Sequence, residues 1–452
     1  MTKVITYGTY DLLHYGHIKL LERAKALGDY LIVGVTASDF DRKRGKINVK
    51  QSLMERIEAV RATGIADEII VEEYEGQKID DIRRLNIDIF TVGSDWESKF
   101  DYLNEYCKVI YLPRTAGVSS SEIRAEQRTI RLGMVGNHNI LLKFKKECSY
   151  INGIQVAALC TTKENLIAKA KSEGIYVTDN YEKMLSLVDA VYIISEPSNH
   201  YQHIKEALLQ KKHVLCEAPV AINDHDFDEV FRIADENRLV LMEGIKTAYS
   251  TAYYRLLLLA QSGEIGNIAA IDATCTSLSD SSSSVRSQNG ETWNSICSWG
   301  PTAMLPIFQL LGTDYMNCTI TSALSTKIEN YDVFTKIDFL YPHAVATLKI
   351  GTGIKSEGEL VVSGSKGYIY VPAPWWKTDY FELRYENQED NRRHFYQLEG
   401  EGIRYEIINF VKSIETKKNS IYLSRKISKG ITNIIEKFYN RVGIQEIQIT
   451  PF

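Results

Sequence analysis

Short runs of apolar, often β-branched residues alternate with helix-type patterns along the first quarter of the chain. The runs VITY, YLIVGVT, EIIVEE, IDIFTVG and KVIYLP are separated by segments such as HIKLLERAKALG and SLMERIEAVRATG. In the latter segment Leu53, Ile57 and Val60 recur at helical spacing and form one apolar stripe. Strands and helices alternating at this spacing predict a parallel sheet covered on both faces, which ends near Glu126.

The same alternation starts again directly afterwards. A strand pattern over Ile130 to Val135 runs into Gly136 and a helix from about Asn139, and IQVAALCT, DAVYIIS, HVLCEA and LVLMEGI follow. This pattern predicts a second doubly wound sheet. After about Ala248 the runs AAIDATCTSL, FTKIDFLY and AVATLKIG alternate apolar and polar residues, which is typical of a largely antiparallel sheet.

We therefore predict an α/β protein with three domains. Two Rossmann-like domains cover residues 1–127 and 128–246, and an α+β domain with an open sheet covers residues 247–452.

Composition narrows the classes of function. Of the 452 residues 44% are hydrophobic and 25% are charged, and the net charge is -5. This balance gives no electrostatic reason to expect binding of nucleic acid or of a membrane surface, so any phosphate must be met by a local positive cluster. No run approaches 18 apolar residues and the N-terminus does not resemble a signal peptide, so we expect a cytoplasmic protein without membrane insertion.

The seven cysteines are scattered along the chain without a CxxC pair. This spacing indicates neither a disulfide framework nor a zinc site, and it is typical of reduced thiols. We predict no protein-held metal site.

The segment YGTYDLLHYGH carries the first candidate chemistry. A predicted strand ends at Gly8. His14 follows in the turn, and His17 stands at the start of a helix whose free amide groups favour an anion. A pair of imidazoles at this place could bind a metal, act as acid and base, donate hydrogen bonds to a phosphoryl group, or cap the helix. A metal would need a third ligand, and none has an obvious spacing.

The segment resembles the GTFDLLHxGH signature of the cytidylyltransferases typified by the glycerol-3-phosphate enzyme, a group of the HxGH nucleotidyltransferase superfamily. The resemblance extends from Lys3 to about Glu126, and RTAGVSS, from Arg114 to Ser120, is similar to the second motif of that family. It implies two sets of site residues. The catalytic set is His14, His17, Lys46 and Arg114. The nucleotide-binding set is Gly8, Thr9, Asp11, Asp95, Thr115, Ser119 and Ser120.

The implied reaction transfers CMP from CTP to a small phosphorylated alcohol, with Mg²⁺ as cofactor and pyrophosphate as leaving group. Its product would be a CDP-alcohol such as CDP-glycerol, and such products serve capsule or teichoic-type polymer synthesis. The acceptor stays open, because Gly64 and Glu75 stand where close relatives carry an arginine and a tryptophan. An adenylyltransferase is the alternative within the same superfamily.

Residues from about Arg128 to Pro372 resemble the Gfo/Idh/MocA oxidoreductases. The residues that support hydride transfer in that family differ here: His138 replaces a glycine of the dinucleotide turn, and Ala218 replaces the lysine of the EKP motif. Ser298 and Thr302 stand at the family's aspartate and proton donor. NAD(P) is therefore doubtful as a cofactor of this half.

Three interpretations of the second half stay open. It is an assembly module that makes the protein a homo-oligomer or presents substrate, a reductase that makes the polyol precursor for a bifunctional enzyme, or a domain for another ligand. His200 and His203 lie at helical spacing and are interpreted as helix-surface residues. The expected partners of the whole chain are CTP and a small phosphomonoester.

Overall fold

The computed structural model describes most of the chain. The residues outside the description are 14, 38–48, 50, 75, 114–128, 152, 279–292, 327, 329, 397, 399, 418, 419, 421 and 449–452. The chain divides into two compact units, Met1–Thr129 and Ile130–Phe452, here called unit 1 and unit 2.

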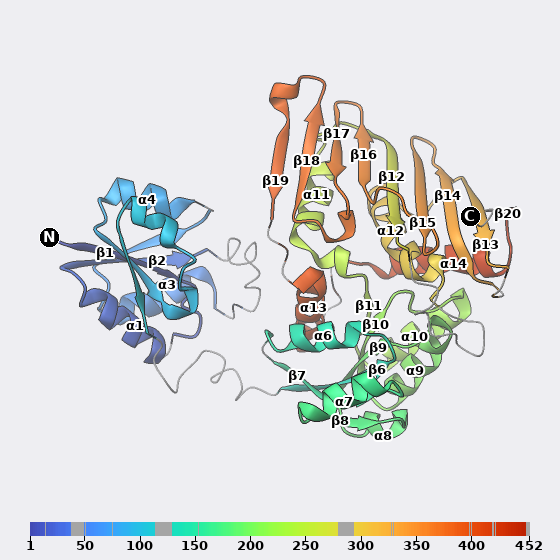
Figure 1. Cartoon of the computed structure of the whole chain (residues 1–452), viewed down its shortest axis with the longest axis horizontal. Helices are drawn as coiled ribbons and strands as arrows, with labels where there is room; N and C mark the ends of the chain where they lie inside the picture. Colours follow the sequence, from blue (N-terminus) through green and yellow to red (C-terminus); the bar gives the residue numbers. More distant parts are fainter. Residues whose placement is uncertain are drawn as a thin grey trace. The chain divides into compact units, whose positions relative to one another are not determined.

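Unit 1 is built on a sheet of five parallel strands in the order β3-β2-β1-β4-β5 (Figure 1). The strands are β1 (Lys3–Gly8), β2 (Tyr30–Thr36), β3 (Glu68–Glu72), β4 (Ile89–Gly93) and β5 (Lys108–Leu112). The helices are α1 (Tyr15–Lys25), α3 (Leu53–Ala62), α4 (Gln77–Leu85) and the short η1 (Ser94–Trp96) and η2 (Asp101–Glu105). The order places β1 in the centre, so the loop after β1 opens at the middle of the carboxyl edge.

The alternation of side chains along β1 separates two apolar layers of unit 1. Val4 packs with α1 and α3 on one face, whereas Ile5 packs with α4 on the other. In α3 the expected stripe is present, with Ile57 and Val60 buried and Leu53 partly buried.

Unit 2 begins with six parallel strands in the order β11-β10-β9-β6-β7-β8. These are β6 (Ile130–Gly136), β7 (Ile154–Cys160), β8 (Tyr176–Thr178), β9 (Ala190–Ile194), β10 (His213–Glu217) and β11 (Leu241–Gly244). Their helices are α6 (Ile140–Cys148), α7 (Glu164–Ser172), α8 (Tyr181–Leu185), α9 (Pro197–Leu209) and α10 (Asp224–Glu236). The strand order reverses between β6 and β9, which is where such sheets open a crevice for ligands.

The rest of unit 2 contains a nine-stranded sheet in the order β19-β18-β17-β16-β12-β15-β14-β13-β20. The strands are β12 (Ile268–Thr276), β13 (Asn317–Leu324), β14 (Asp332–Leu340), β15 (Val345–Gly351), β16 (Leu360–Gly364), β17 (Gly367–Val371), β18 (Tyr380–Tyr385), β19 (Arg392–Phe395) and β20 (Ile444–Ile447). The sheet is mixed: most neighbours are antiparallel as expected, but β12 with β15 and β13 with β20 are parallel.

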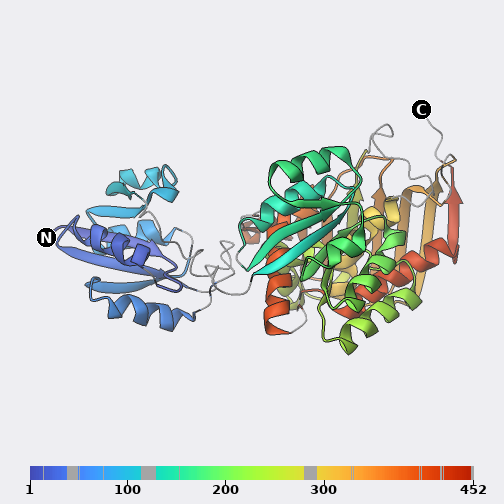
Figure 2. The ribbon, with the colours of Figure 1, turned by 90° about the horizontal axis from the view of Figure 1, so that it is seen from below.

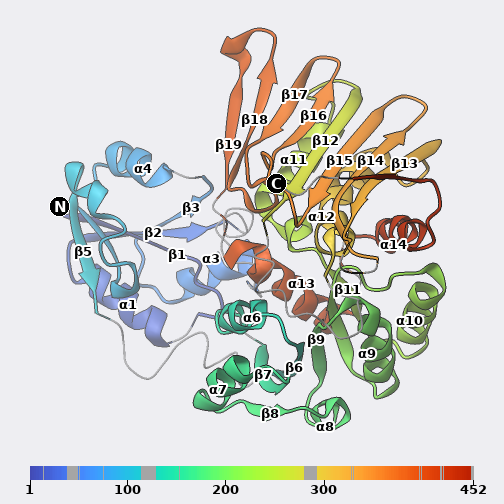
Figure 3. The ribbon, with the colours of Figure 1, turned by 45° about the vertical axis from the view of Figure 1, so that its right-hand side comes forward.

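Helices join the two sheets of unit 2. They are α11 (Thr251–Gln261), α12 (Ser295–Leu311), α13 (Ile403–Thr416) and α14 (Arg425–Tyr439), with short helical turns η3 (Lys246–Tyr249), η4 (Trp375–Lys377), η5 (Gln388–Asp390) and η6 (Gly400–Gly402). α12 packs on β12, β14 and β15, and α14 packs on both α12 and α10 (Figures 2 and 3). α13 packs on α6 and η3. The observed layers confirm the predicted α/β class with two Rossmann-type sheets and an α+β remainder.

All seven cysteines are free thiols, and five of them are buried. The two that are only partly buried are Cys107 in unit 1 and Cys318 in unit 2. Among the described helices, none has the length and apolar character needed to cross a bilayer.

Candidate functional site

The loop that follows β1 carries the described part of the candidate site in unit 1. Tyr10 and Leu12 have positive φ angles of 53° and 48°, so the backbone turns sharply after Thr9. A Cβ atom on Gly8 would lie 2.9 Å from the ring of Tyr10. Glycine is therefore required here because the buried Tyr10 ring packs against the backbone.

Arg56 of α3 holds the backbone of this loop in place through hydrogen bonds. Its Nη1 donates to the carbonyl oxygens of Thr9 and Thr36, at 2.8 Å each, and its Nε lies 3.3 Å from the Gln51 carbonyl. The side chain is fully buried. Sequence reasoning missed it, because a charged residue in an amphipathic helix is expected on the exposed face.

Asp11 is also buried, with 3% of its surface exposed. Its Oδ1 accepts a hydrogen bond of 3.0 Å from the backbone N–H of Gln51, and the Gln51 side chain accepts one of 2.7 Å from the N–H of Leu12. These two bonds tie the loop after β1 to the segment before α3.

His17 lies in the first turn of α1, which begins two residues earlier than expected, at Tyr15. Its ring contacts that of Tyr10 edge-on, with centroids 5.6 Å apart. The packed Tyr10 ring therefore restricts the orientation of the imidazole beside the loop after β1.

The other predicted site residues cannot be placed relative to these. His14, Lys46, Arg114, Thr115, Ser119 and Ser120 lie outside the described residues. For Asp95 only the backbone is described, in η1 directly after β4, the strand that pairs with β1. The roles of these residues stay predictions.

A buried polar network that the sequence did not reveal lies between β1, β2, β3 and α4. Asp81 accepts hydrogen bonds from Tyr7 Oη, at 2.9 Å, and from Gln77 Nε2, at 3.0 Å. Lys78 forms an ion pair with Glu72, and its Nζ lies 4.7 Å from the centre of the Tyr7 ring. Burial and the neighbouring Asp81 carboxylate raise the pKa of Tyr7, so its hydroxyl stays protonated and donates.

The turn between β6 and α6 is the candidate dinucleotide site of unit 2. Gly136 has φ 137°, and a Cβ there would lie 2.3 Å from the carbonyl oxygen of Ile194 on β9. Asn137 Oδ1 accepts from Thr161 Oγ1, at 2.8 Å, and from the N–H of Thr162, at 3.1 Å. The turn is therefore bonded to the segment after β7, where the ribose of a dinucleotide is normally bound.

His138 closes the same turn. Its Nδ1 accepts a hydrogen bond of 3.2 Å from the N–H of Ile140, the first residue of α6. The side chain of His138 is exposed, but desolvation by its neighbours and the charge of Lys163 lower its pKa, so the neutral ring is able to accept. A dinucleotide diphosphate bound at this turn would use the same amide, so it would compete with the His138 imidazole for that donor.

A second cluster of buried and partly buried polar side chains lies at the carboxyl ends of β10 and β11. Glu217 accepts a hydrogen bond of 2.5 Å from Tyr192 Oη. Glu406 of α13 lies against β11, since a Cβ on Gly244 would be 2.4 Å from its Oε1. Burial raises the pKa of both carboxyl groups.

The expectation that His200 is a surface residue is wrong. Its ring is fully buried, with Nδ1 2.8 Å from the Pro219 carbonyl and Nε2 2.8 Å from the Ser195 carbonyl. Burial lowers its pKa to about 4, so the neutral ring donates to one of the two carbonyls at pH 7. A helix-surface pattern cannot predict this, because the covering segment after β10 is remote in sequence.

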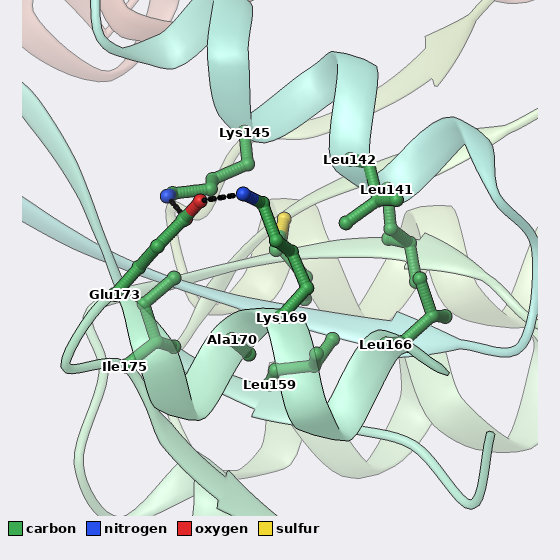
Figure 4. Close-up of a pocket in the computed structure, with 10 residues that line it drawn as sticks. Leu141, Leu142, Lys145, Leu159, Leu166, Lys169, Ala170, Glu173 and Ile175 are labelled. Carbon is green, nitrogen blue, oxygen red and sulfur yellow. Dashed lines mark ion pairs between the residues drawn. The ribbon is translucent and has the colours of Figure 1, made fainter. Parts of the chain in front are cut away.

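Two further features of the described residues do not provide a ligand site. An apolar depression between α6 and α7 is lined by Leu141, Leu159 and Leu166, and Glu173 bridges Lys145 and Lys169 at its rim (Figure 4). The apolar side chains of this depression pack α6 against α7, and Glu173 forms ion pairs with both lysines. We therefore assign no ligand to it. Within the described ranges no three His, Cys, Asp or Glu residues gather in a way that could hold a metal ion.

Comparison with families and curated proteins relates unit 1 to nucleotidyltransferases. The family described as Cytidylyltransferase-like matches residues 5–126. A glycerol-3-phosphate cytidylyltransferase from Bacillus spizizenii is 49% identical over 130 residues, which are its whole length and 29% of this chain. The Bacillus subtilis enzyme of the same name is 50% identical over 126 residues, 97% of its length and 28% of this chain.

Unit 2 has relatives of another kind. The family described as Oxidoreductase family, NAD-binding Rossmann fold, matches residues 130–245. A 3-ketoreductase from Actinomadura kijaniata, solved with NADP and TDP-benzene, matches with a TM-score of 0.64 and 17% identity, over 72% of this chain and 100% of its own. A UDP-N-acetylglucosamine 3-dehydrogenase from Acidithiobacillus ferrooxidans matches with a TM-score of 0.58 and 16% identity, over 70% and 98% of the two chains.

These structural likenesses establish the fold of unit 2, whereas the sequence matches of unit 1 cover complete relatives. The chain therefore belongs to the cytidylyltransferase-like family through unit 1, and residues 130–245 of unit 2 match the family described as Oxidoreductase family, NAD-binding Rossmann fold.

Proposed function

We propose that unit 1 transfers CMP from CTP to a small phosphorylated alcohol. The observation that carries this proposal is the match of 49% identity over the complete length of a glycerol-3-phosphate cytidylyltransferase. Glycerol phosphate or another polyol phosphate is the acceptor, and the CDP-alcohol product serves surface-polymer synthesis in the cytoplasm. Adenylyl transfer is the alternative to be tested.

The chemistry needs no protein nucleophile, because the acceptor phosphate is itself largely dianionic at pH 7. One of its oxygens bonds to the α-phosphorus of CTP, while the bond from that phosphorus to the bridging oxygen breaks and pyrophosphate leaves. His14 and His17 stabilise charge on the α-phosphoryl oxygens, and Lys46 and Arg114 bind the phosphates. Thr115, Ser119 and Ser120 contact the triphosphate, and Gly8, Thr9, Asp11 and Asp95 shape the nucleotide site.

The geometry of the loop after β1 supports this assignment. Arg56 and Asp11 hold the loop backbone through hydrogen bonds, and the ring of Tyr10 packs edge-on against the ring of His17. A preorganised donor stabilises a transition state without a reorganisation cost. Mg²⁺ would supply charge neutralisation at the triphosphate, but no described cluster of side chains fits a metal ion, so we assign it no protein ligand.

The test is a substrate panel with one variant. Purified full-length protein is assayed for pyrophosphate release with CTP or ATP and with a series of polyol phosphates. We expect CTP to be the better nucleotide and His17→Ala to lower kcat by about 10²–10³-fold. His225→Ala, which changes an exposed histidine on α10, is the matched control and should have wild-type kcat. Faster turnover of ATP would overturn the proposal.

For unit 2 we propose an assembly role without NAD(P)-dependent turnover, which makes the protein a homo-oligomer. Two observations support the lack of turnover: His138 Nδ1 accepts from the first amide of α6, and Ala218 stands at the position of the family's lysine. Titration of the full chain with NADPH tests this view. We expect no saturable binding, and tight binding by the unmodified protein would support the bifunctional reductase instead. His138→Gly is the comparison variant, since it frees the Ile140 amide.

A further inference from the structure

Three lysines of unit 2 gather around a single carboxylate. Glu401, in η6, accepts a hydrogen bond of 3.0 Å from Lys143 Nζ at its Oε1. Its Oε2 lies 3.6 Å from Lys246 Nζ and 3.7 Å from Lys377 Nζ. The three lysines come from α6, η3 and η4, which are distant in sequence. We call this group the three-lysine cluster.

The three-lysine cluster keeps an excess of positive charge. Glu401 is ionised, because the hydrogen bond from Lys143 and the other two ammonium groups lower its pKa. Glu217 and Glu406 also lie near Lys246, and burial raises the pKa of both, so this pair does not carry two full charges. Glu147, next to Gly400, is paired with Arg404 instead. Even with one charge shared by Glu217 and Glu406, these two acids and Glu401 do not balance three ammonium groups.

The backbone that carries Glu401 is held in an unfavourable conformation. Gly400, Glu401 and Gly402 have φ angles of 58°, 54° and 90°, so three consecutive residues lie in the left-handed region. A Cβ on Gly400 would lie 2.2 Å from Glu147 Oε2, and one on Gly402 would lie 3.2 Å from the Lys246 carbonyl oxygen. Glycines thus flank Glu401 where the backbone is left-handed and an added Cβ would be tight, and the non-glycine residue between them carries strain that is typical of functional sites.

The location of the three-lysine cluster is that of a ligand site. Lys246 is the second residue after β11 and Lys143 lies in α6, the helix after β6, so both are at the carboxyl edge of the six-stranded sheet. Open α/β sheets bind their ligands at this edge. The side chains of Lys246 and Glu401 are 26% and 39% exposed, so a ligand can reach them.

We propose that the three-lysine cluster binds a ligand with a doubly charged phosphate or diphosphate group, and that Glu401 occupies the site in the ligand-free protein. Three ammonium groups supply more donors and more charge than one carboxylate can use, whereas a phosphate dianion matches both. Two sources have this chemistry: a phosphomonoester such as glycerol 3-phosphate, and a diphosphate diester such as CDP-glycerol. The inference concerns unit 2 and goes beyond the transferase activity proposed for unit 1.

Hydrogen exchange of the full-length protein, measured by mass spectrometry, tests the proposal because it locates binding along the chain. Glycerol 3-phosphate, CDP-glycerol and NADPH are titrated in separate arms, and protection is followed in the peptides that cover α6 and η6. We expect one of the first two ligands to protect both peptides. Half-saturation should occur at about tenfold lower concentration in Glu401→Gln, which loses the internal competitor. In the double variant Lys246→Ala/Lys377→Ala, half-saturation should require a ligand concentration at least about tenfold higher than in wild type.

Lys412→Ala is the matched control. It removes an exposed lysine from α13, the helix that follows η6, and should behave as wild type. Protection confined to unit 1, equal half-saturation in wild type and Glu401→Gln, or protection by NADPH alone would each overturn the proposal. A parallel assay of pyrophosphate release separates this outcome from the proposed function, because loss of the unit 2 site should leave transfer by unit 1 intact.

Discussion

Arg56 shows how a single buried side chain organises the loop that carries the candidate active site of unit 1. Its guanidinium donates to the carbonyl oxygens of Thr9, in that loop, and of Thr36, at the end of β2. Arginine suits this task because its donors form a rigid planar fork, whereas lysine offers a single charged point.

Replacement of Arg56 by methionine should therefore destabilise the protein. The substitution fills most of the volume but leaves buried carbonyl oxygens without a donor, and we expect a loss of about 3 kcal/mol in the free energy of unfolding. Urea denaturation measures it. Arg61→Met on the same helix, where the arginine is exposed and paired only with Glu58 at the surface, should change stability by less than about 0.5 kcal/mol. Equal effects of the two variants would contradict the role given to Arg56.

Glu243 makes the stability of unit 2 depend on pH. Burial raises its pKa from 4.5 to about 7, so the folded protein binds a proton more tightly than the unfolded chain does. The stability that this proton contributes is complete below about pH 4.5 and is lost as the pH rises through 7. Glu243→Gln has no proton to lose, so its stability relative to wild type should increase by about 3 kcal/mol from pH 5 to pH 8.

Denaturation of both proteins at the two pH values checks this prediction. Glu236→Gln, at an exposed position of α10, is the control and should differ from wild type by the same amount at both pH values. A pH-independent difference for Glu243→Gln would show that the carboxyl group titrates normally.

At the scale of elements, the turn between β6 and α6 depends on the absence of a side chain at Gly136. We expect Gly136→Ala to destabilise unit 2 by about 3 kcal/mol or more, because its Cβ would overlap the Ile194 carbonyl oxygen. Gly174→Ala is the control: its φ of 74° is also positive, but no atom lies within 4 Å of the added Cβ. That variant should lose only about 1 kcal/mol. Thermal unfolding distinguishes the two, and similar melting temperatures would contradict the steric argument.

Strand and helix patterns predicted most elements of both Rossmann-type sheets, because buried parallel strands and amphipathic helices have distinct periodicities. The same patterns could not predict that β12 pairs in parallel with β15, since pairing joins segments about 70 residues apart along the chain. The burial of His200 and Arg56 was missed for the same reason: both are covered or bonded by remote segments. Of the candidate site, the loop after β1 was predicted from its motif, whereas the network around Asp81 has no local signal.

At the scale of the whole molecule, the two units have separate cores, and relatives of unit 1 exist as complete proteins of similar length. A fragment of residues 1–129 should therefore fold and keep transferase activity within about threefold of the full chain. If unit 2 is the assembly module, the fragment should also have a smaller oligomer number by light scattering. An inactive but folded fragment would show that unit 2 completes the active site, and an unchanged oligomer number would count against the assembly role.

The distribution of the thiols has a practical consequence for spectroscopy. Cys107 and Cys318 are the two cysteines that are only partly buried, and each unit contains one of them. Burial raises the pKa of both thiols, so maleimide dyes should react with them slowly at pH 7 and faster at higher pH, at one position per unit and without prior removal of the buried cysteines. Energy transfer between a donor and an acceptor dye would then report the distance between the nucleotidyltransferase unit and the oxidoreductase-like unit, and its change when CTP binds.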